Sequence, residues 1–139
     1  MKPGAFLRAA RDAGARVGRP ASPSDRARWR ARFPGVRLPN DLLGFYRRAD
    51  GAAFPGGRLL PLGEIRPATD LLFEDLEDED EGLPSSWLAL TDEPAAEAYL
   101  VFDADRRVYL ELDPDDPDEH RTVGAAFEDA LAWILARYG

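Results

Sequence analysis

The sequence predicts an α+β fold in one domain, residues 1–139, with N-terminal helices, an antiparallel sheet of about four to five strands and a C-terminal helix. Three observations support this prediction. Apolar residues recur at helical spacing in the first third of the chain, follow strand-like patterns in the second half, and return to helical spacing over residues 125–138. A chain of this length buries roughly two-thirds of its unfolded surface, so it needs no disulfide or metal to fold.

The first helix is expected over about residues 4–16. Gly18 and Pro20 should end it, because neither residue suits the interior of a helix. Apolar residues on its buried face recur every three or four positions, at Phe6, Ala10, Ala13 and Val17.

A second helix is expected after Ser22, which can act as its N-cap, with Pro23 at the first helical position and Asp25 completing a capping box. Trp29 and Phe33 share one face of this helix. Around that face stand Arg26, Arg28, Arg30 and Arg32. An arginine-rich helix is typical of nucleic-acid binding, but the sequence pI of about 4.7 and the lack of a second basic or aromatic surface argue against a nucleic-acid partner.

The rest of the fold is expected to pack around Leu38–Phe54. Pro39 favours extended backbone before it and is tolerated in a first helical turn, where Asn40 or Asp41 can accept free backbone N–H groups. Gly51 supplies the positive φ that ends such a helix. The apolar stripe of this helix consists of Leu42, Phe45, Tyr46 and Ala49.

The second half of the chain is predicted to form mainly strands. A short strand over Arg58–Leu62 is limited by Pro61, and a short helix after Pro67 is one alternative for residues 64–73. Asp103–Arg107 is long enough for a hairpin loop between the last two of three further strands. These three strands are Trp87–Thr91, Tyr99–Phe102 and Val108–Leu112.

The chain is predicted to close with its longest helix, Ala125–Tyr138. Its buried stripe is expected to consist of Phe127, Leu131, Ile134, Leu135 and Tyr138. Trp133 points roughly 120° away from the centre of that stripe. Trp133 therefore either covers the margin of its own core, which is the favoured interpretation, or anchors a partner protein.

The two halves of the chain carry opposite charge. Residues 1–66 contain 14 Lys and Arg against 5 Asp and Glu, whereas residues 67–139 contain 4 against 21. This asymmetry indicates either an interaction surface or two halves that fold together and partly neutralise each other. The acidic residues concentrate in two expected surface loops, Glu74–Glu81 and Asp113–His120, of which the second is stiffened by two prolines.

The residue inventory argues against catalysis. The chain has no Cys and one His, His120, with no nucleophile near it in sequence. No carboxylate lies in an apolar segment that would raise its pKa, and Gly56-Gly57 lacks the residues of a phosphate-binding loop. Asp113–Glu119 offers oxygen ligands for calcium but lacks the spacing of an EF-hand. We therefore expect no catalytic residue, no metal site, no cofactor and no enzyme activity.

The sequence also predicts where the protein acts. Its N-terminal region is interrupted by Arg and Gly, unlike a secretory signal. No apolar run approaches the ~18 residues of a membrane span. We expect a cytoplasmic protein that does not bind membranes.

Several of these features together resemble the SUKH superfamily, which includes bacterial immunity proteins and a fungal regulator of cell-wall assembly. The resemblance is carried first by a motif that starts at Leu38-Pro39, continues through Leu42–Tyr46 and ends at Asp50-Gly51. At this last position the superfamily more often has Asn-Gly. It extends over nearly the whole chain, through the strand pair at Phe102–Leu110 and the Phe127-Glu128 start of the last helix. The acidic segment Glu74–Glu81 is not a landmark of the superfamily.

The resemblance implies a non-enzymatic immunity protein that binds a cognate bacterial toxin, of nuclease or deaminase class, and blocks it by stoichiometric occlusion. The alternative is a scaffold or regulatory module, with a carboxylate hydrolase as a third interpretation. A toxin that binds nucleic acid has a basic cleft, so acidic loops are the expected contact surface. The expected partner-binding residues are Glu74, Asp75, Glu77, Asp78, Glu79, Asp80, Glu81, Asp113, Asp115, Asp116, Asp118, Glu119 and Trp133.

Overall fold

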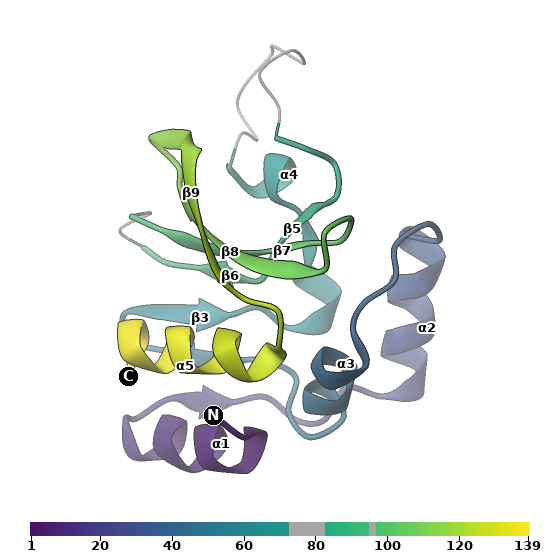
Figure 1. The fold of residues 1–139 in the computed structure, drawn as a ribbon. Coiled ribbons are helices and arrows are strands. Elements are labelled where there is room, and N and C mark those ends of the chain that lie inside the picture. The colour runs from purple at the N-terminus through teal and green to yellow at the C-terminus, as the bar shows by residue number, and fades with distance from the viewer. Residues whose placement is uncertain (73–82, 95–96) are drawn as a thin grey trace.

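The computed structural model describes residues 1–72, 83–94 and 97–139, and it confirms the α+β class. Most of the helices lie in the lower part of Figure 1 with short strands beside them, and a larger group of antiparallel strands lies above them. The helices are α1 (Pro3–Asp12), α2 (Pro23–Arg32), α3 (Asn40–Tyr46), α4 (Ala68–Leu72) and α5 (Phe127–Tyr138), with a 3-10 turn η1 (Leu62–Glu64).

The described strands form two sheets instead of the single sheet expected, and every pairing is antiparallel. The four-stranded sheet has the order β1 (Arg16–Val17), β2 (Ala52–Phe54), β3 (Gly57–Leu59) and β6 (Thr91–Asp92). The five-stranded sheet has the order β4 (Arg66–Pro67), β5 (Trp87–Ala89), β7 (Tyr99–Asp103), β8 (Val108–Asp113) and β9 (Asp116–Gly124).

The chain passes from one sheet to the other at Leu90. The Leu90 N–H donates to the carbonyl of Leu100 at 2.9 Å, next to the five-stranded sheet, and the Leu90 carbonyl accepts the N–H of Leu60 at 2.8 Å. Sequence patterns could not separate β5 from β6, because Trp87–Thr91 is buried without interruption across the change of sheet. The expected strand Trp87–Thr91 is therefore divided between two sheets.

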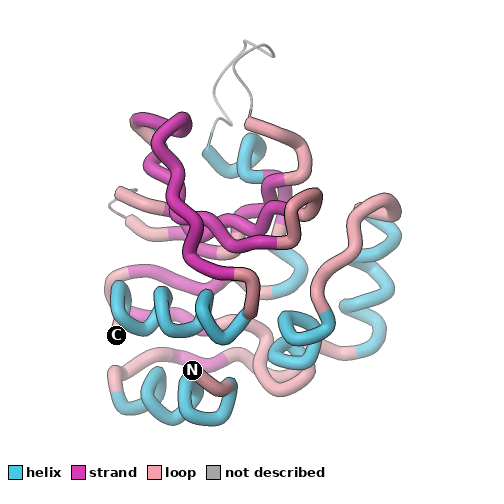
Figure 2. Tube along the Cα trace, viewed as in Figure 1, coloured by secondary structure: helices cyan, strands magenta, loops and turns pink. Residues whose placement is uncertain are grey.

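The helices surround the four-stranded sheet. α1 and α5 contact each other, and β3 passes behind α5 in the view of Figure 1. α2 and α3 stand together at one side, and the strands of the five-stranded sheet lie beyond β3 (Figure 2). α2 also contacts η1.

The predicted apolar stripe is confirmed in its burial, because all four of its members lie in the main hydrophobic core with no exposed surface: Leu42, Phe45, Tyr46 and Ala49. The helix is shorter than this stripe, since α3 ends at Tyr46 and Ala49 follows it after a turn. Phe45 is the centre of the stripe. The Phe45 ring lies 5.7 Å from the Phe6 ring in α1 and 5.4 Å from the Phe127 ring in α5. Such aromatic contacts join the first, middle and last helices of the described chain in one core.

The predicted capping residues are also confirmed. The Ser22 hydroxyl accepts the Asp25 N–H at 3.1 Å, and the Asp25 carboxylate accepts the Ser22 N–H at 2.9 Å. Asp41 accepts the Leu42 N–H at 2.9 Å and also the N–H of Phe127, at the start of α5, at 2.8 Å. One carboxylate thus holds the beginnings of two helices together.

Asp50-Gly51 has a clear structural role at the end of the α3 segment. Gly51 has φ +84°, and a Cβ there would lie 2.6 Å from the Leu59 carbonyl oxygen, so no other residue fits without a shift of the backbone. The Asp50 carboxylate accepts the N–H of Leu62 at 2.7 Å. The pair thereby fixes the return of the chain from α3 to the β2–β3 hairpin and η1.

Strand β7 shows why the second half has long apolar runs. All five of its residues are buried. Leu100 and Phe102 face the main core, whereas Tyr99 and Val101 belong to a second, smaller cluster on the other face of the five-stranded sheet. A strand covered on both faces reads as a continuous apolar run and not as an alternation.

Two expectations about element boundaries are wrong. α1 ends at Asp12 and not near residue 16, because Gly14 turns the chain with φ +84° and Val17 then pairs with Ala52 in β1. Asp113–His120 is not a loop: only Pro114 and Asp115 separate β8 from β9. β9 is an edge strand, which tolerates both Pro117 and a row of charges because one of its sides makes no ladder hydrogen bonds.

Candidate binding surface

The end of the β8–β9 hairpin presents a group of five exposed carboxylates, which we call the acidic hairpin: Asp113, Asp115, Asp116, Asp118 and Glu119. In the described part of the chain none of them forms an ion pair. The Asp113 carboxylate accepts the N–H of Asp115 at 2.9 Å and so closes the tight turn. Figure 1 shows this end of the hairpin projecting beyond the other strands of its sheet.

The pairing of β8 with β9 shifts register within the hairpin. Glu111 lies opposite Arg121 and Asp113 lies opposite Asp116, so four residues of β9 bulge against one residue of β8. Bulges bend and twist an edge strand away from its sheet. This irregularity accounts for the projection of the acidic hairpin, and no periodic pattern in the sequence indicates it.

His120 anchors the bulge. Its ring lies 4.9 Å from the Trp87 ring, and its Nδ1 is 3.3 Å from the Pro117 carbonyl oxygen. The His120 side chain is half-buried, although it lies in a segment rich in charged residues. Nothing in this arrangement supplies a nucleophile to the imidazole.

The second acidic segment, Glu74–Glu81, lies outside the described residues. Thr69 and Leu83 flank it. The Thr69 hydroxyl oxygen accepts the N–H of Leu83 at 2.9 Å and donates to its carbonyl at 3.2 Å. Leu83 packs on the same small cluster as Trp87, so this flank and His120 of β9 contact one patch of the five-stranded sheet.

Trp133 lies at the margin of the main core, half-buried. Its Nε1–H donates to the Glu111 carboxylate at 2.8 Å, and the same carboxylate pairs with Arg121 at 2.9 Å. The Arg137 guanidinium lies 5.5 Å from the centre of the Trp133 ring. These contacts tie α5 to β8 and β9 and give Trp133 a role within the fold, while its contact with a partner stays a prediction.

An ion pair between the buried Glu93 and the partly exposed Arg137 lies at the C-terminal end of α5. Glu93 is 6% exposed, and Arg137 binds it through two hydrogen bonds of 2.7 and 2.9 Å. The Glu93 carboxylate also accepts the N–H groups of Glu97 and Ala98. The hydrogen bonds from Arg137 lower the pKa of Glu93 to about 2, so this carboxylate is fixed in its charged form and is unsuited to donate a proton.

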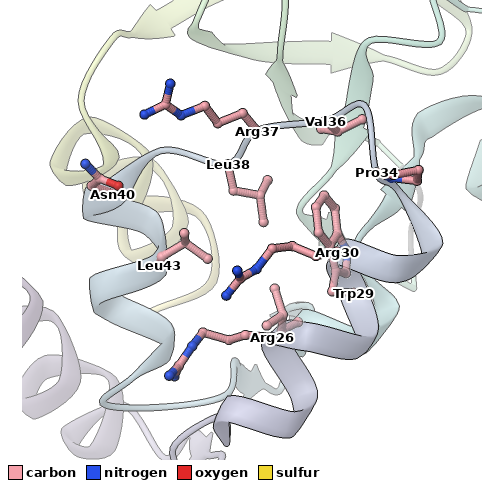
Figure 3. A pocket seen from close by; sticks show the side chains of 10 residues that line it. Arg26, Trp29, Arg30, Pro34, Val36, Arg37, Leu38, Asn40 and Leu43 are labelled. Carbon is pink, nitrogen blue, oxygen red and sulfur yellow. The ribbon is translucent and has the colours of Figure 1, made fainter.

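A concave site of opposite charge, which we call the Arg-lined pocket, lies between α2 and α3 and encloses about 530 Å³. Arg26, Arg30 and Arg37 line it, and no Asp or Glu does. Figure 3 shows Arg26 and Arg30 reaching from α2 across the opening toward α3, with Arg37 on the rim. Apolar side chains form the rest, including Trp29, Leu38 and Leu43. The sequence shows the four-residue spacing of Arg26 and Arg30, but it did not indicate a pocket.

The described residues hold neither a metal cluster nor a membrane span. No three His, Cys, Asp or Glu side chains in residues 1–72, 83–94 and 97–139 gather as metal ligands. No helix in these ranges has the length and apolar character that crossing a bilayer requires.

Comparison with known proteins places the chain in a family. No curated protein sequence matches it closely enough to count as a relative. The sequence profile of the SMI1 / KNR4 family (SUKH-1), however, matches residues 20–133, from just before α2 to the middle of α5. This range contains the α3 stripe, Asp50-Gly51 and both described sheets except β1. The chain belongs to the SMI1 / KNR4 family (SUKH-1).

Proposed function

We propose that this protein is an immunity protein that binds a cognate bacterial toxin with a basic surface and blocks it by stoichiometric occlusion. Its family is consistent with an immunity type of function and implies a protein toxin as partner. The acidic hairpin is the observation that supports the charge of that partner, because five exposed carboxylates lie together and none of them forms an ion pair in the described part of the chain.

The mechanism that we propose has two steps. Unpaired carboxylates on a projecting hairpin attract a basic surface over a distance of about 8 Å, the screening length at physiological ionic strength. This attraction raises the association rate more than it raises the affinity. The hairpin then lies over the toxin's substrate cleft and excludes the substrate, so inhibition requires no chemistry from this chain.

The position of the acids on an edge strand provides a competing explanation. Charged residues on an edge strand also prevent it from pairing with strands of other molecules. The two explanations differ in what they require, since edge protection needs charge of either sign, whereas toxin binding needs negative charge. Reversal of the hairpin charges therefore separates them.

A regulatory module that binds endogenous proteins is the alternative function. The Arg-lined pocket favours it, because a concave surface of positive charge is not needed to occlude a basic cleft. Under this alternative the protein would co-purify with proteins unrelated to a toxin.

The test uses the protein encoded beside this gene, co-expressed and purified with the full chain. Three variants are compared: the five hairpin acids changed to Ser, the same five changed to Lys, and the seven acids of Glu74–Glu81 changed to Ser. If the acidic hairpin steers association, both hairpin variants should associate about ten-fold or more slowly at low salt, with a deficit that shrinks as salt rises.

The variant in Glu74–Glu81 shows how the two acidic segments share this role. A comparable deficit there would make both segments part of the contact surface. Association that is equally fast in all three variants and the wild type, at every ionic strength, would exclude electrostatic binding by these acids. A hairpin Lys variant that aggregates no more than the wild type yet fails to bind would assign the acids to the toxin and not to edge protection.

A further inference from the structure

We propose that the Arg-lined pocket is a second binding site, which takes an acidic peptide segment with an apolar side chain from a protein partner. This site is separate from the acidic hairpin, and it does not depend on the immunity role. The proposal rests on the charge, shape and rigidity of the pocket.

The charge of the pocket is uncompensated. Within the described residues, Arg26, Arg30 and Arg37 form no ion pair, and the only side-chain hydrogen bond among them runs from Arg26 to the Ala21 carbonyl at 3.3 Å. The acid of the same helix nearest to them, Asp25, is used in the capping box with Ser22. Three cationic groups thus converge on one opening in a protein whose net charge is −8, and planar guanidinium groups suit carboxylates.

The floor of the pocket is apolar. Trp29 and Leu38 are 2% and 5% exposed, and Leu43 is half-buried at the edge. Figure 3 shows Leu38 pointing into the space between α2 and α3. A volume of about 530 Å³ falls within the range of roughly 300–1,000 Å³ that is typical of ligand sites. An apolar floor beneath a cationic rim fits a ligand that combines an apolar side chain with neighbouring carboxylates.

The walls of the pocket are fixed before any ligand arrives. The Trp29 Nε1–H donates to the buried Ile65 carbonyl at 2.9 Å. Arg32, one turn further along α2, donates to the Gly63 carbonyl at 3.0 Å. On the opposite rim, the Arg107 guanidinium donates to the Arg37 carbonyl and lies 5.1 Å from the centre of the Phe102 ring. A site held in this way loses little conformational freedom on binding.

The observations favour a peptide over a nucleic acid. Single-stranded nucleic acids bind by stacking on exposed aromatic rings, but the one aromatic residue that lines the pocket, Trp29, is buried. A long polyanion would also be repelled by the acidic remainder of this protein. A short acidic peptide places few charges near the arginines and avoids that repulsion.

The experiment is a selection from a displayed library of random peptides against the full chain. The variant Arg30→Glu/Arg37→Glu is selected in parallel. The matched control, Arg8→Glu/Arg16→Glu, makes the same change of charge at exposed arginines of α1 and β1. All four substituted positions are exposed, so thermal unfolding of both variants should match the wild type and show that any loss of binding is local.

We expect the enriched peptides to combine Asp or Glu with Leu, Ile, Val or Phe. The best of them, measured by fluorescence anisotropy, should lose about ten-fold or more in affinity for the pocket variant and less than about two-fold for the control. Replacing its acidic residues by Asn, or its apolar residue by Ser, should each weaken binding.

Four results would overturn the proposal. These are no enrichment against the wild type, enriched peptides without acidic residues, equal losses in the pocket variant and the control, and tighter binding of a short oligouridylate RNA than of the best peptide. The last result would assign the pocket to nucleic acid. None of them bears on toxin binding, which is measured with a different protein and a different set of variants.

Discussion

Helix α3 and the acidic hairpin are opposite in construction. The apolar stripe of α3 has no exposed surface, and Phe45 joins α1 to α5. The acidic hairpin is exposed, and its carboxylates form no ion pair with a described residue. Burial supplies stability, and exposed charge supplies long-range attraction at little benefit to the fold. The comparison indicates that stability and recognition are carried by different residues, so each can be changed without the other.

The largest expected effect is on stability, at the centre of the α3 stripe. Phe45→Ala should lower the free energy of unfolding by about 3–5 kcal/mol, because the ring is fully buried between Phe6 and Phe127. Phe33→Ala removes the same side chain at a half-buried position just after the end of α2 and should cost about 1–2 kcal/mol. Urea unfolding measures both. A Phe45 variant of wild-type stability that had lost its partner would make the stripe an interface.

A buried carboxylate should behave unlike those of the acidic hairpin. Pairing with Arg137 lowers the pKa of Glu93 to about 2, from 4.5 for an unperturbed glutamate. The ion pair therefore stabilises the fold fully above about pH 5, and this stabilisation is lost as the pH falls toward 2. This difference corresponds to a loss of up to about 3 kcal/mol. Acid unfolding monitored by circular dichroism tests this expectation.

Two matched variants localise that acid sensitivity. Glu93→Gln should be less stable at neutral pH and should flatten the curve between about pH 5 and pH 2. Glu97→Gln makes the same change near the same Arg137, at a side chain that is 75% exposed, and should alter stability by under about 0.5 kcal/mol. Identical pH profiles for Glu93→Gln and the wild type would contradict the role of this ion pair.

The acids of the acidic hairpin should contribute little to the free energy of unfolding. Changing its five acids to Ser should shift the free energy of unfolding by no more than about 0.5 kcal/mol, and upward if like-charge repulsion dominates. The same urea series used for Phe45 measures it. A loss of several kcal/mol would show that these residues support the fold and would break the comparison.

The smallest expected effect is that of calcium. The acidic hairpin has carboxylates but no arrangement of them that surrounds a calcium ion, so little metal binding should be coupled to folding. Thermal midpoints with chelator and with calcium at about 1 mM should therefore agree closely. A calcium-dependent rise of several degrees would instead make Asp113–Glu119 a metal site.

The sequence predicted most where local patterns and burial agree. The α3 stripe, the Ser22 capping box and the β7–β8 hairpin follow from periodicity and turn chemistry, and all are present. The extent of β9 was missed because edge strands tolerate proline and charge, which locally resemble a loop. Sequence spacing could not show the Glu93–Arg137 pair or the Arg-lined pocket, because both arise only when distant segments pack together.

The central claim, blockade of a toxin by a stoichiometric complex, is tested most directly by titration. The protein encoded beside this gene is the candidate toxin, and its toxic activity is measured at a fixed concentration while the full chain is added. We expect activity to fall in proportion to the protein added, to vanish at equimolar amounts, and to be independent of incubation time once the complex has formed. Toxin activity that persists at molar excess, or that is abolished over time by catalytic amounts of this protein, would contradict the claim.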